Sequence, residues 1–237
     1  MKTRAIIFFL LATVSLTGLQ VVKAQSMTDQ PDSRGATGVP EAAVATAPDV
    51  TYTRPTPKIK LRNYLFDTFG PYPIVGAALA AGVNQAERTP PEWQQGAEGY
   101  GKRVASDFGI AGVTTTTRYA LATAFGEDTL YYRCACKGFF PRLGHAVLST
   151  FTSRRGEDGH RVFSFPAVVA PYVGTMTAVY AWYPGRYNAS DGFRMGNYSL
   201  LGYAAGNIAL EFLYSGPHSW ISRMHLNNGH GAQGSQH

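Results

Sequence analysis

The chain has 237 residues, which is enough for one domain with a hydrophobic core of ordinary size. Its formal net charge is +6, but three of the basic residues and none of the acids lie in the first 24 positions, so the remainder carries +3. A charge this small argues against a nucleic-acid-binding protein, and we expect no nucleic acid among its partners.

Residues 1–24 have the pattern of a cleaved signal peptide. Lys2 and Arg4 precede an uninterrupted run of apolar and small residues over 5–16, and Val22-Lys23-Ala24 offers small side chains at the positions that a signal peptidase recognises. The apolar run is shorter than the roughly 20 residues that span a bilayer. We therefore expect an exported protein, located in the periplasm, the outer membrane or elsewhere in the cell envelope.

A disordered leader is predicted over 25–57. This segment is rich in Pro, Ser, Thr, Ala and Asp and has no apolar periodicity, so burial cannot offset the conformational entropy that ordering would cost. The last stretch, 223–237, is polar and its histidines do not have metal-ligand spacing, which predicts a disordered tail without a metal site. The ordered domain is therefore expected over 58–222.

Two helices are expected at the start of this domain. From about Lys58, apolar side chains recur at helical spacing, and the pair Gly70-Pro71 ends the pattern. The second helix, 73–88, consists mainly of Val, Gly, Ala and Leu. Its small side chains allow a neighbouring backbone to approach closely.

A third helix is predicted to begin at residues 89–92, which read Thr-Pro-Pro-Glu. Threonine can cap a helix, proline suits the first turn, and an acid is favourable near the positive end of the helix dipole. We expect this helix to reach Phe125, with a break near 109–112. Residues 114–117 are all threonine, whose β-branched side chain lowers helix propensity, so a strand there is the alternative.

The stretch 126–161 holds both cysteines, Cys134 and Cys136, which are separated by one residue. A local disulfide or a pair of buried thiols is the preferred interpretation, and half of a soft-metal site is the alternative. The Cys-x-x-Cys spacing of redox-active pairs is missing. We expect the stretch to act as a polar connection between two helical halves, with a chain reversal at 155–159 because of its glycines.

The candidate catalytic residues lie in this same stretch. Arg142 and His145 are three residues apart on a predicted helix and so share a face, with Ser149 one turn further along. In a hydrolase, His145 would be the base for Ser149, Glu127 or Asp128 would orient its ring, and Arg142 would hold an anion. No Gly-x-Ser-x-Gly motif is present, so a structural role for His145 is the alternative.

Residues 162–183 form an uncharged run of about 22 residues, which is long enough to span a bilayer. Trp182 and Tyr183 at its far end are typical of a membrane interface. Against this interpretation, Pro166 and Pro171 would interrupt the first part of a spanning helix. A buried helix of a soluble bundle is the alternative.

The last helix is predicted over 191–214. It contains the pairs Gly192/Gly196 and Gly202/Gly206, whose spacing is typical of helices that pack closely together. Since glycine costs a helix about 1 kcal/mol relative to alanine, these pairs predict backbone contact.

Two polar residues of the same helix, Asn207 and Glu211, lie one turn apart. In a soluble bundle they would face water or a polar partner. In a membrane, Glu211 would need a charged partner, for which Arg118 is the candidate.

A resemblance to a known family rests on four motifs. These are Glu92-Trp93-Gln94-Gln95-Gly96, Glu98-Gly99-Tyr100-Gly101-Lys102-Arg103, Arg142-x-Gly-x-Ala146 and Arg155-Gly-Glu-Asp-Gly-His-Arg161. Over residues 90–183 the chain resembles an uncharacterised family of exported acidobacterial proteins. The resemblance implies export and helical character, and it implies no activity and no catalytic residue.

The sequence as a whole predicts a mainly α-helical single domain of about five or six helices, packed through Gly and Ala faces. We expect a non-enzymatic, structural or membrane-associated protein of the cell envelope, without a cofactor, whose partner is a membrane lipid or another envelope protein. The alternatives are an exported hydrolase with the His/carboxylate/Arg site, and a helical bundle that binds a lipid or small ligand.

Overall fold

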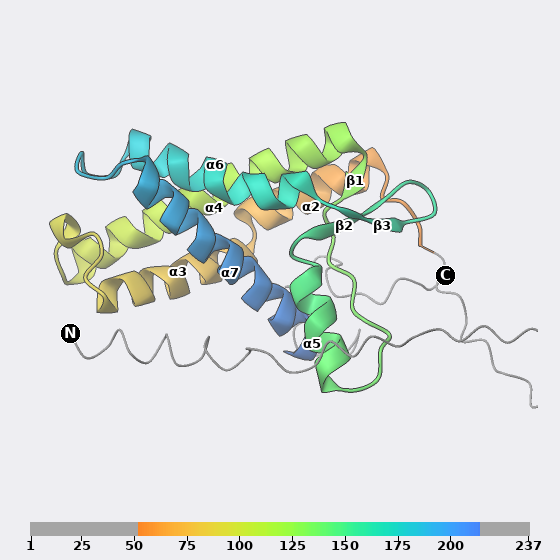
Figure 1. The fold of residues 1–237 in the computed structure, drawn as a ribbon. Helices are drawn as coiled ribbons and strands as arrows, with labels where there is room; N and C mark the ends of the chain where they lie inside the picture. The colour runs from red at the N-terminus through yellow and green to blue at the C-terminus, as the bar shows by residue number, and fades with distance from the viewer. Residues whose placement is uncertain (1–51, 214–237) are drawn as a thin grey trace, which may run out of the picture. The chain divides into compact units, whose positions relative to one another are not determined.

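The computed structural model describes residues 52–213 and confirms the mainly helical fold. This part of the chain contains six α-helices and one short antiparallel sheet (Figure 1). The predicted signal peptide, nearly all of the predicted leader and the predicted tail lie outside the described residues. The described part begins slightly before the expected domain boundary, and Tyr52 there is already buried.

The first two helices, α2 (Pro57–Phe69) and α3 (Pro71–Ala86), lie close to their predicted positions. A proline occupies the first turn of each, where its missing N–H costs nothing. The Thr56 hydroxyl caps α2 by accepting a hydrogen bond from the Ile59 amide at 3.4 Å. Gly70 separates the two helices, as its position before a proline predicts.

The third helix starts later than predicted. Residues 91–93 form only a 3-10 turn, η1 (Pro91–Trp93), and α4 runs from Ala97 to Phe125. Between them the backbone leaves the helical region, with φ of 55° at Gln94 and 92° at Gly96. The turn therefore ends before a second helical turn can form.

The expected break near 109–112 is absent, and the strand alternative for 114–117 is wrong, because α4 is continuous through both segments. The Thr116 hydroxyl donates to the Gly112 carbonyl, one turn earlier, at 2.8 Å. This bond satisfies the hydroxyl within the helix but does not raise helix propensity, and the packing of α4 along α6 keeps the threonines helical.

The central stretch contains a sheet that the sequence analysis missed. Strands β1 (Glu127–Asp128), β2 (Thr152–Arg155) and β3 (His160–Phe163) pair antiparallel in the order β1-β2-β3. Strands of two to four residues are too short to show alternation in a sequence. The predicted chain reversal is confirmed as the turn between β2 and β3, in which Gly156 and Gly159 have φ of 78° and 65°.

Helix α5 (Phe139–Leu148) lies between β1 and β2 in the chain, and α6 (Phe165–Ala181) follows β3. The uncharged run 162–183 is therefore not one helix. Pro171 does not break α6, although interruption was expected. No helix within 52–213 is long and apolar enough to cross a membrane.

Helix α7 (Ala189–Leu213) packs closely on α6, as its first glycine pair predicts. A Cβ atom on Gly192 would come within 2.6 Å of Met176 Sδ, and Gly196 is buried against the ring of Tyr172. In the second pair, a Cβ atom on Gly206 would lie 2.8 Å from the hydroxyl of Tyr72 on α3, whereas one on Gly202 would meet no atom within 4 Å, so only Gly206 of this pair is in close contact.

Figure 1 shows α6 running along α4, while α7 crosses from the α6 end of the domain to α5. The buried apolar side chains at these contacts are mostly alanine, which confirms packing through small faces. They are Ala77, Ala81, Ala122, Ala146, Ala167, Ala170 and Ala178.

Candidate functional site

Glu127 is buried on β1 and is 3% exposed. Its Oε2 accepts a hydrogen bond from Ser164 Oγ at 2.5 Å, and its main-chain carbonyl accepts one from Lys60 Nζ at 2.9 Å. Ser164 also accepts from the Ala167 amide at 3.1 Å and so caps α6. Glu127 therefore connects the sheet to the start of α6.

Asp128 is also buried, and two tyrosines donate hydrogen bonds to its carboxylate. Its Oδ2 accepts hydrogen bonds from the hydroxyls of Tyr52 at 3.1 Å and Tyr132 at 2.6 Å, and its Oδ1 accepts one from the Leu130 amide at 3.0 Å. Burial raises the pKa of both tyrosines, and the nearby carboxylate raises it further. The tyrosines thus remain donors, and Asp128 joins the chain before α2 to the segment after β1.

Arg142 forms an ion pair with Glu211, near the end of α7. Its Nε lies 2.7 Å from Glu211 Oε1, and a second guanidinium nitrogen donates to the main-chain carbonyl of the same residue. The other oxygen, Oε2, accepts from the Tyr131 hydroxyl at 2.7 Å and from the Cys134 amide at 3.1 Å. The Glu211 side chain is 0% exposed.

The charge of Glu211 is stabilised in spite of this burial. Burial alone would raise the pKa of its carboxyl, but the hydrogen bonds from Arg142, Tyr131 and the Cys134 amide hold that pKa below its usual value. This cluster ties α5, the segment after β1 and α7 together.

His145 lies on α5 near this cluster, at 6.0 Å between its ring centroid and that of Tyr131. Its Nε2 is 2.7 Å from a guanidinium nitrogen of Arg161, on β3. Burial lowers the pKa of His145, and the charge of Arg161 lowers it further, so the ring is neutral at pH 7 and accepts this hydrogen bond. Its Nδ1 is buried and has no partner among the described residues.

The four predicted catalytic residues therefore fall into two groups. Arg142 and His145 share one face of α5, as predicted, whereas Glu127 and Asp128 have other partners. Within the described structure, neither of these carboxylates hydrogen-bonds to His145. A general base needs a free lone pair, and Arg161 occupies the one on Nε2. The geometry thus favours the structural interpretation of His145, and the hydrolase stays a prediction.

Glu211 is the central residue of the cluster, and no site prediction included it. The signal was present, because Glu211 is the one acid in the otherwise uncharged part of α7 after Arg194, and a buried acid needs a partner. Arg118, the partner considered for a membrane setting, instead has its guanidinium carbon 5.7 Å from the ring centroid of Tyr203. Asn207 donates to Thr150 Oγ1 at 3.1 Å, as expected for a polar partner.

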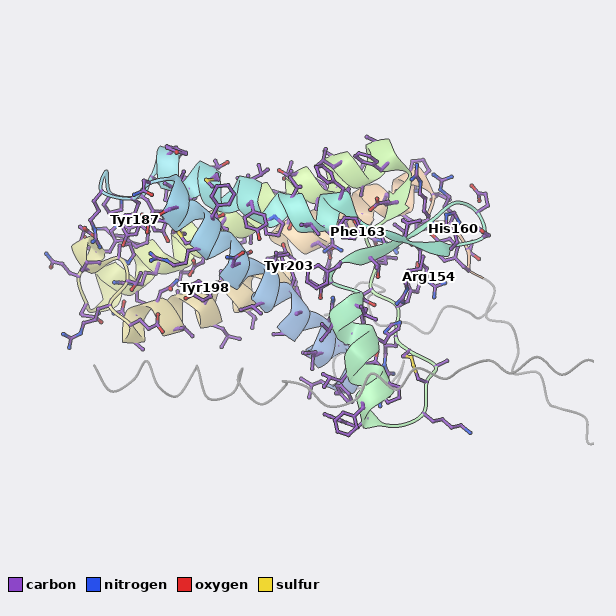
Figure 2. The ribbon with its side chains drawn as sticks, viewed as in Figure 1. Arg154, His160, Phe163, Tyr187, Tyr198 and Tyr203 are labelled. Atoms are coloured by element: carbon purple, nitrogen blue, oxygen red, sulfur yellow. A yellow bond between two sulfur atoms is a disulfide. The ribbon has the colours of Figure 1, made fainter. Side chains whose placement is uncertain are left out.

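Cys134 and Cys136 form a disulfide, visible as the yellow bond in Figure 2, in agreement with the first of the two preferred interpretations. Their Cα atoms lie 5.1 Å apart. The disulfide lies in the segment that supplies the Cys134 amide to Glu211. Its position therefore indicates a structural role in the cluster.

No group of three or more His, Cys, Asp or Glu side chains within residues 52–213 is arranged to hold a metal ion. The polar groups described above instead satisfy one another. In comparisons with known proteins, no family model matches the chain, and neither a curated protein nor a solved structure is significantly similar to it.

Proposed function

We propose that this chain is an exported, non-enzymatic protein of the cell envelope that associates with a membrane surface through apolar side chains on its outside. The observation that supports this proposal is the size distribution of those side chains. In a water-soluble helical domain, large aliphatic side chains are the ones most often buried. Here the buried apolar positions hold mostly alanine, and many large apolar side chains lie outside.

Helix α3 shows the distribution most clearly. Its sixteen residues include no charged side chain. Ala77 and Ala81 are buried, at 4% and 0% exposure, whereas Leu79 and Val83 on the opposite side are 69% and 59% exposed. Together with Val75, these two make the outer face of α3, a stripe along one side of the helix.

Helix α2 behaves in the same way. The side chains whose spacing predicts this helix do not enter the core, since Leu61, Leu65 and Phe69 are 58%, 48% and 60% exposed. Lys58 and Arg62 are also exposed on this helix. Basic side chains beside exposed apolar ones are typical of segments that bind the surface of an anionic membrane.

The outside of α6 and α7 continues the pattern. Large apolar or aromatic side chains with exposures from 54% to 73% are Tyr180, Phe193, Tyr198, Leu201 and Leu213. Helices that contact one another through small residues and turn large apolar side chains outward are typical of proteins in lipid. Burial of one such side chain is worth about 1.5–3 kcal/mol when complete, so partial burial of a few is enough for membrane binding.

The test is flotation of the purified protein with vesicles of phosphatidylethanolamine and phosphatidylglycerol. We expect the protein to float with the vesicles. The variant Leu79→Glu/Val83→Glu places two charges on the outer face of α3 and should weaken binding at least about tenfold, because a charge is costly in the apolar part of the interface. The matched control Ala105→Glu/Ser190→Glu adds the same charges at other exposed positions and should still float.

Two results would contradict the proposal. If the unmodified protein stays in the soluble fraction, both with vesicles and after gentle lysis of the cells that produce it, the membrane part is wrong. If N-terminal sequencing of the mature protein does not begin after Ala24, or the protein stays in the cytoplasm, the export part is wrong.

A further inference from the structure

A small pocket beside the sheet is lined by three arginines from three different elements. Arg118 comes from α4, Arg154 from β2 and Arg161 from β3, and Ser149 at the end of α5 also lines it. Figure 2 shows Arg154 on the sheet and Tyr203 on the neighbouring α7. The cavity has a volume of about 40 Å³, which is room for a very small group. We call it the arginine pocket.

One acid lies beside this pocket, because Asp128 is directly paired with Arg154 across β1 and β2, but its carboxylate accepts hydrogen bonds from Tyr52, Tyr132 and the Leu130 amide. No Asp or Glu lines the pocket itself. Arg54, Arg142, Arg186 and Arg194 each form an ion pair with a carboxylate elsewhere in the described chain. None of the pocket arginines has such an ion pair among the described residues.

The pocket arginines are held in place by uncharged groups instead. The guanidinium carbon of Arg154 lies 4.5 Å from the ring centroid of Tyr132, and that of Arg118 lies 5.7 Å from the ring of Tyr203. Arg161 donates to neutral His145 at 2.7 Å. These contacts orient the guanidinium groups and leave their charge available to a ligand.

The two arginines on the sheet also repel one another. Arg154 and Arg161 are directly paired across β2 and β3. Burial lowers the pKa of Arg161, and the charge of Arg154 lowers it further. Like charges opposite each other destabilise a sheet. Asp128, on the other side of Arg154, offsets part of this repulsion, and a bound anion would reduce it further.

The pocket also offers a hydroxyl group. Ser149 Oγ is buried and has no hydrogen-bond partner among the described residues. A buried hydroxyl without a partner costs about 1–3 kcal/mol, which a ligand that accepts its hydrogen bond would recover. The pocket thus combines three cationic donors with a buried hydroxyl that lacks a partner among the described residues.

We propose that the arginine pocket binds the phosphate group of a small ligand, either free phosphate or the headgroup phosphate of a lipid. Arg118, Arg154 and Arg161 supply charge and paired N–H donors, which match the oxygens of a phosphate, and Ser149 supplies a further donor. The volume selects a single small group. This site is separate from the outer face of α3 and does not depend on the membrane proposal.

The test uses the full chain as produced, at constant ionic strength and pH 7. Inorganic phosphate is titrated while the melting temperature is recorded, with chloride as the reference anion. A ligand that binds the folded state raises this temperature in a saturable way. We expect Arg154→Gln and Arg118→Gln each to weaken phosphate binding about tenfold or more, since each removes a charged donor. Ser149→Ala should weaken it by a smaller factor.

The control variant is Arg194→Gln, which removes an exposed arginine that pairs with Asp191 at 2.7 Å, outside the pocket. It should leave the phosphate affinity unchanged. Circular dichroism establishes that each variant is folded. If a pocket variant does not fold, the response of the unmodified protein to phosphate and to chloride still decides whether an anion site exists.

A second arm identifies the source of the phosphate. Vesicles with and without phosphatidylglycerol are compared for the unmodified protein and for Arg154→Gln. Binding that needs both the anionic lipid and Arg154, without saturable binding of free phosphate, assigns the site to a lipid headgroup. Saturable binding of free phosphate assigns it to a soluble ligand. The proposal is wrong if neither is observed, or if Arg154→Gln and Arg194→Gln reduce binding equally.

Discussion

The ion pair of Arg142 and Glu211 is the interaction whose removal should affect the stability of this domain most directly. It joins α5 to the end of α7 across 69 residues of sequence. We consider the substitution Arg142→Met, which keeps much of the length of the side chain and its contact with Phe212 but removes the charge. After this change the Glu211 carboxylate remains buried, with only Tyr131 and the Cys134 amide as donors.

The expected cost follows from the exposure of the two partners. Removing one partner of a fully buried ion pair costs about 3–5 kcal/mol. The Glu211 side chain is 0% exposed, but that of Arg142 is 26% exposed, so water can reach part of the site. We therefore expect Arg142→Met to lower the free energy of unfolding by about 3 kcal/mol at pH 7, the lower end of that range.

A second substitution separates the effect of charge from that of packing. In Arg142→Met/Glu211→Gln the buried group is neutral, and its amide oxygen still accepts from Tyr131. The double variant should recover part of the lost stability, so its free energy of unfolding should be higher than that of Arg142→Met alone.

The pH dependence provides an independent check of the same interaction. The folded-state pKa of Glu211 is lower than its unfolded value, so its contribution to stability is complete above the unfolded pKa of about 4.3 and is lost as the pH falls through the folded pKa. In Arg142→Met the same carboxyl is buried without its main donor, so its folded-state pKa rises above the unfolded value and protonation relieves part of the cost. The difference between the unmodified protein and Arg142→Met should therefore be largest at pH 7, should decrease as the pH falls and should be smallest below about pH 4.

The assay is urea unfolding followed by circular dichroism, with the free energy of unfolding extrapolated to zero urea at each pH. A loss below about 1 kcal/mol for Arg142→Met would show that the pair behaves as an exposed salt bridge. Likewise, a double variant that is less stable than Arg142→Met would refute the argument that the unpaired buried charge is the source of the cost.

Two further predictions concern α4 and its neighbours. Burial raises the pKa of Asp107 to about 6. Its ionisation therefore destabilises the fold as the pH rises from about 4 to 6, and Asp107→Asn should be more stable than the unmodified protein by roughly 1–3 kcal/mol at pH 7 but not at pH 4. Equal effects at both pH values in urea unfolding would contradict this prediction. A Cβ atom on Gly174 would lie 2.8 Å from the Ile110 carbonyl oxygen, so Gly174→Ala should cost about 1–3 kcal/mol. Gly112→Ala, where nothing lies within 4 Å, should be neutral or stabilising by up to about 1 kcal/mol, and similar melting temperatures for the two alanine variants would show that α4 and α6 are not in close contact.

Much of the local structure could be predicted because it depends on residues close together in the chain. The prolines and Gly70 delimit α2 and α3, and the glycines at 156–159 specify a chain reversal. The predictions were wrong where tertiary contacts determine the secondary structure or where the elements are very short. The threonines at 114–117 stay helical because α4 packs along α6, and the sheet consists of strands too short for a periodic signal.

The candidate site was predicted less completely. Arg142 and His145 could be predicted to lie together because they are three residues apart on one helix. Their partners, Glu211 and Arg161, could not, because they lie far away in the chain. Glu127 and Asp128 were placed beside His145 on sequence proximity alone, and the sheet instead directs them to Ser164 and the tyrosines.

The sequence by itself determined where most helices lie and that they pack through small residues, because propensity, capping and glycine spacing act within a few positions of the chain. Only the tertiary structure decided which side of each helix faces outward and which charges meet. A stripe of apolar residues has the same spacing whether it contacts protein or lies at the surface, as Leu61, Leu65 and Phe69 do. The pairing of Arg142 with Glu211 and the gathering of three arginines in one pocket depend on how distant elements dock.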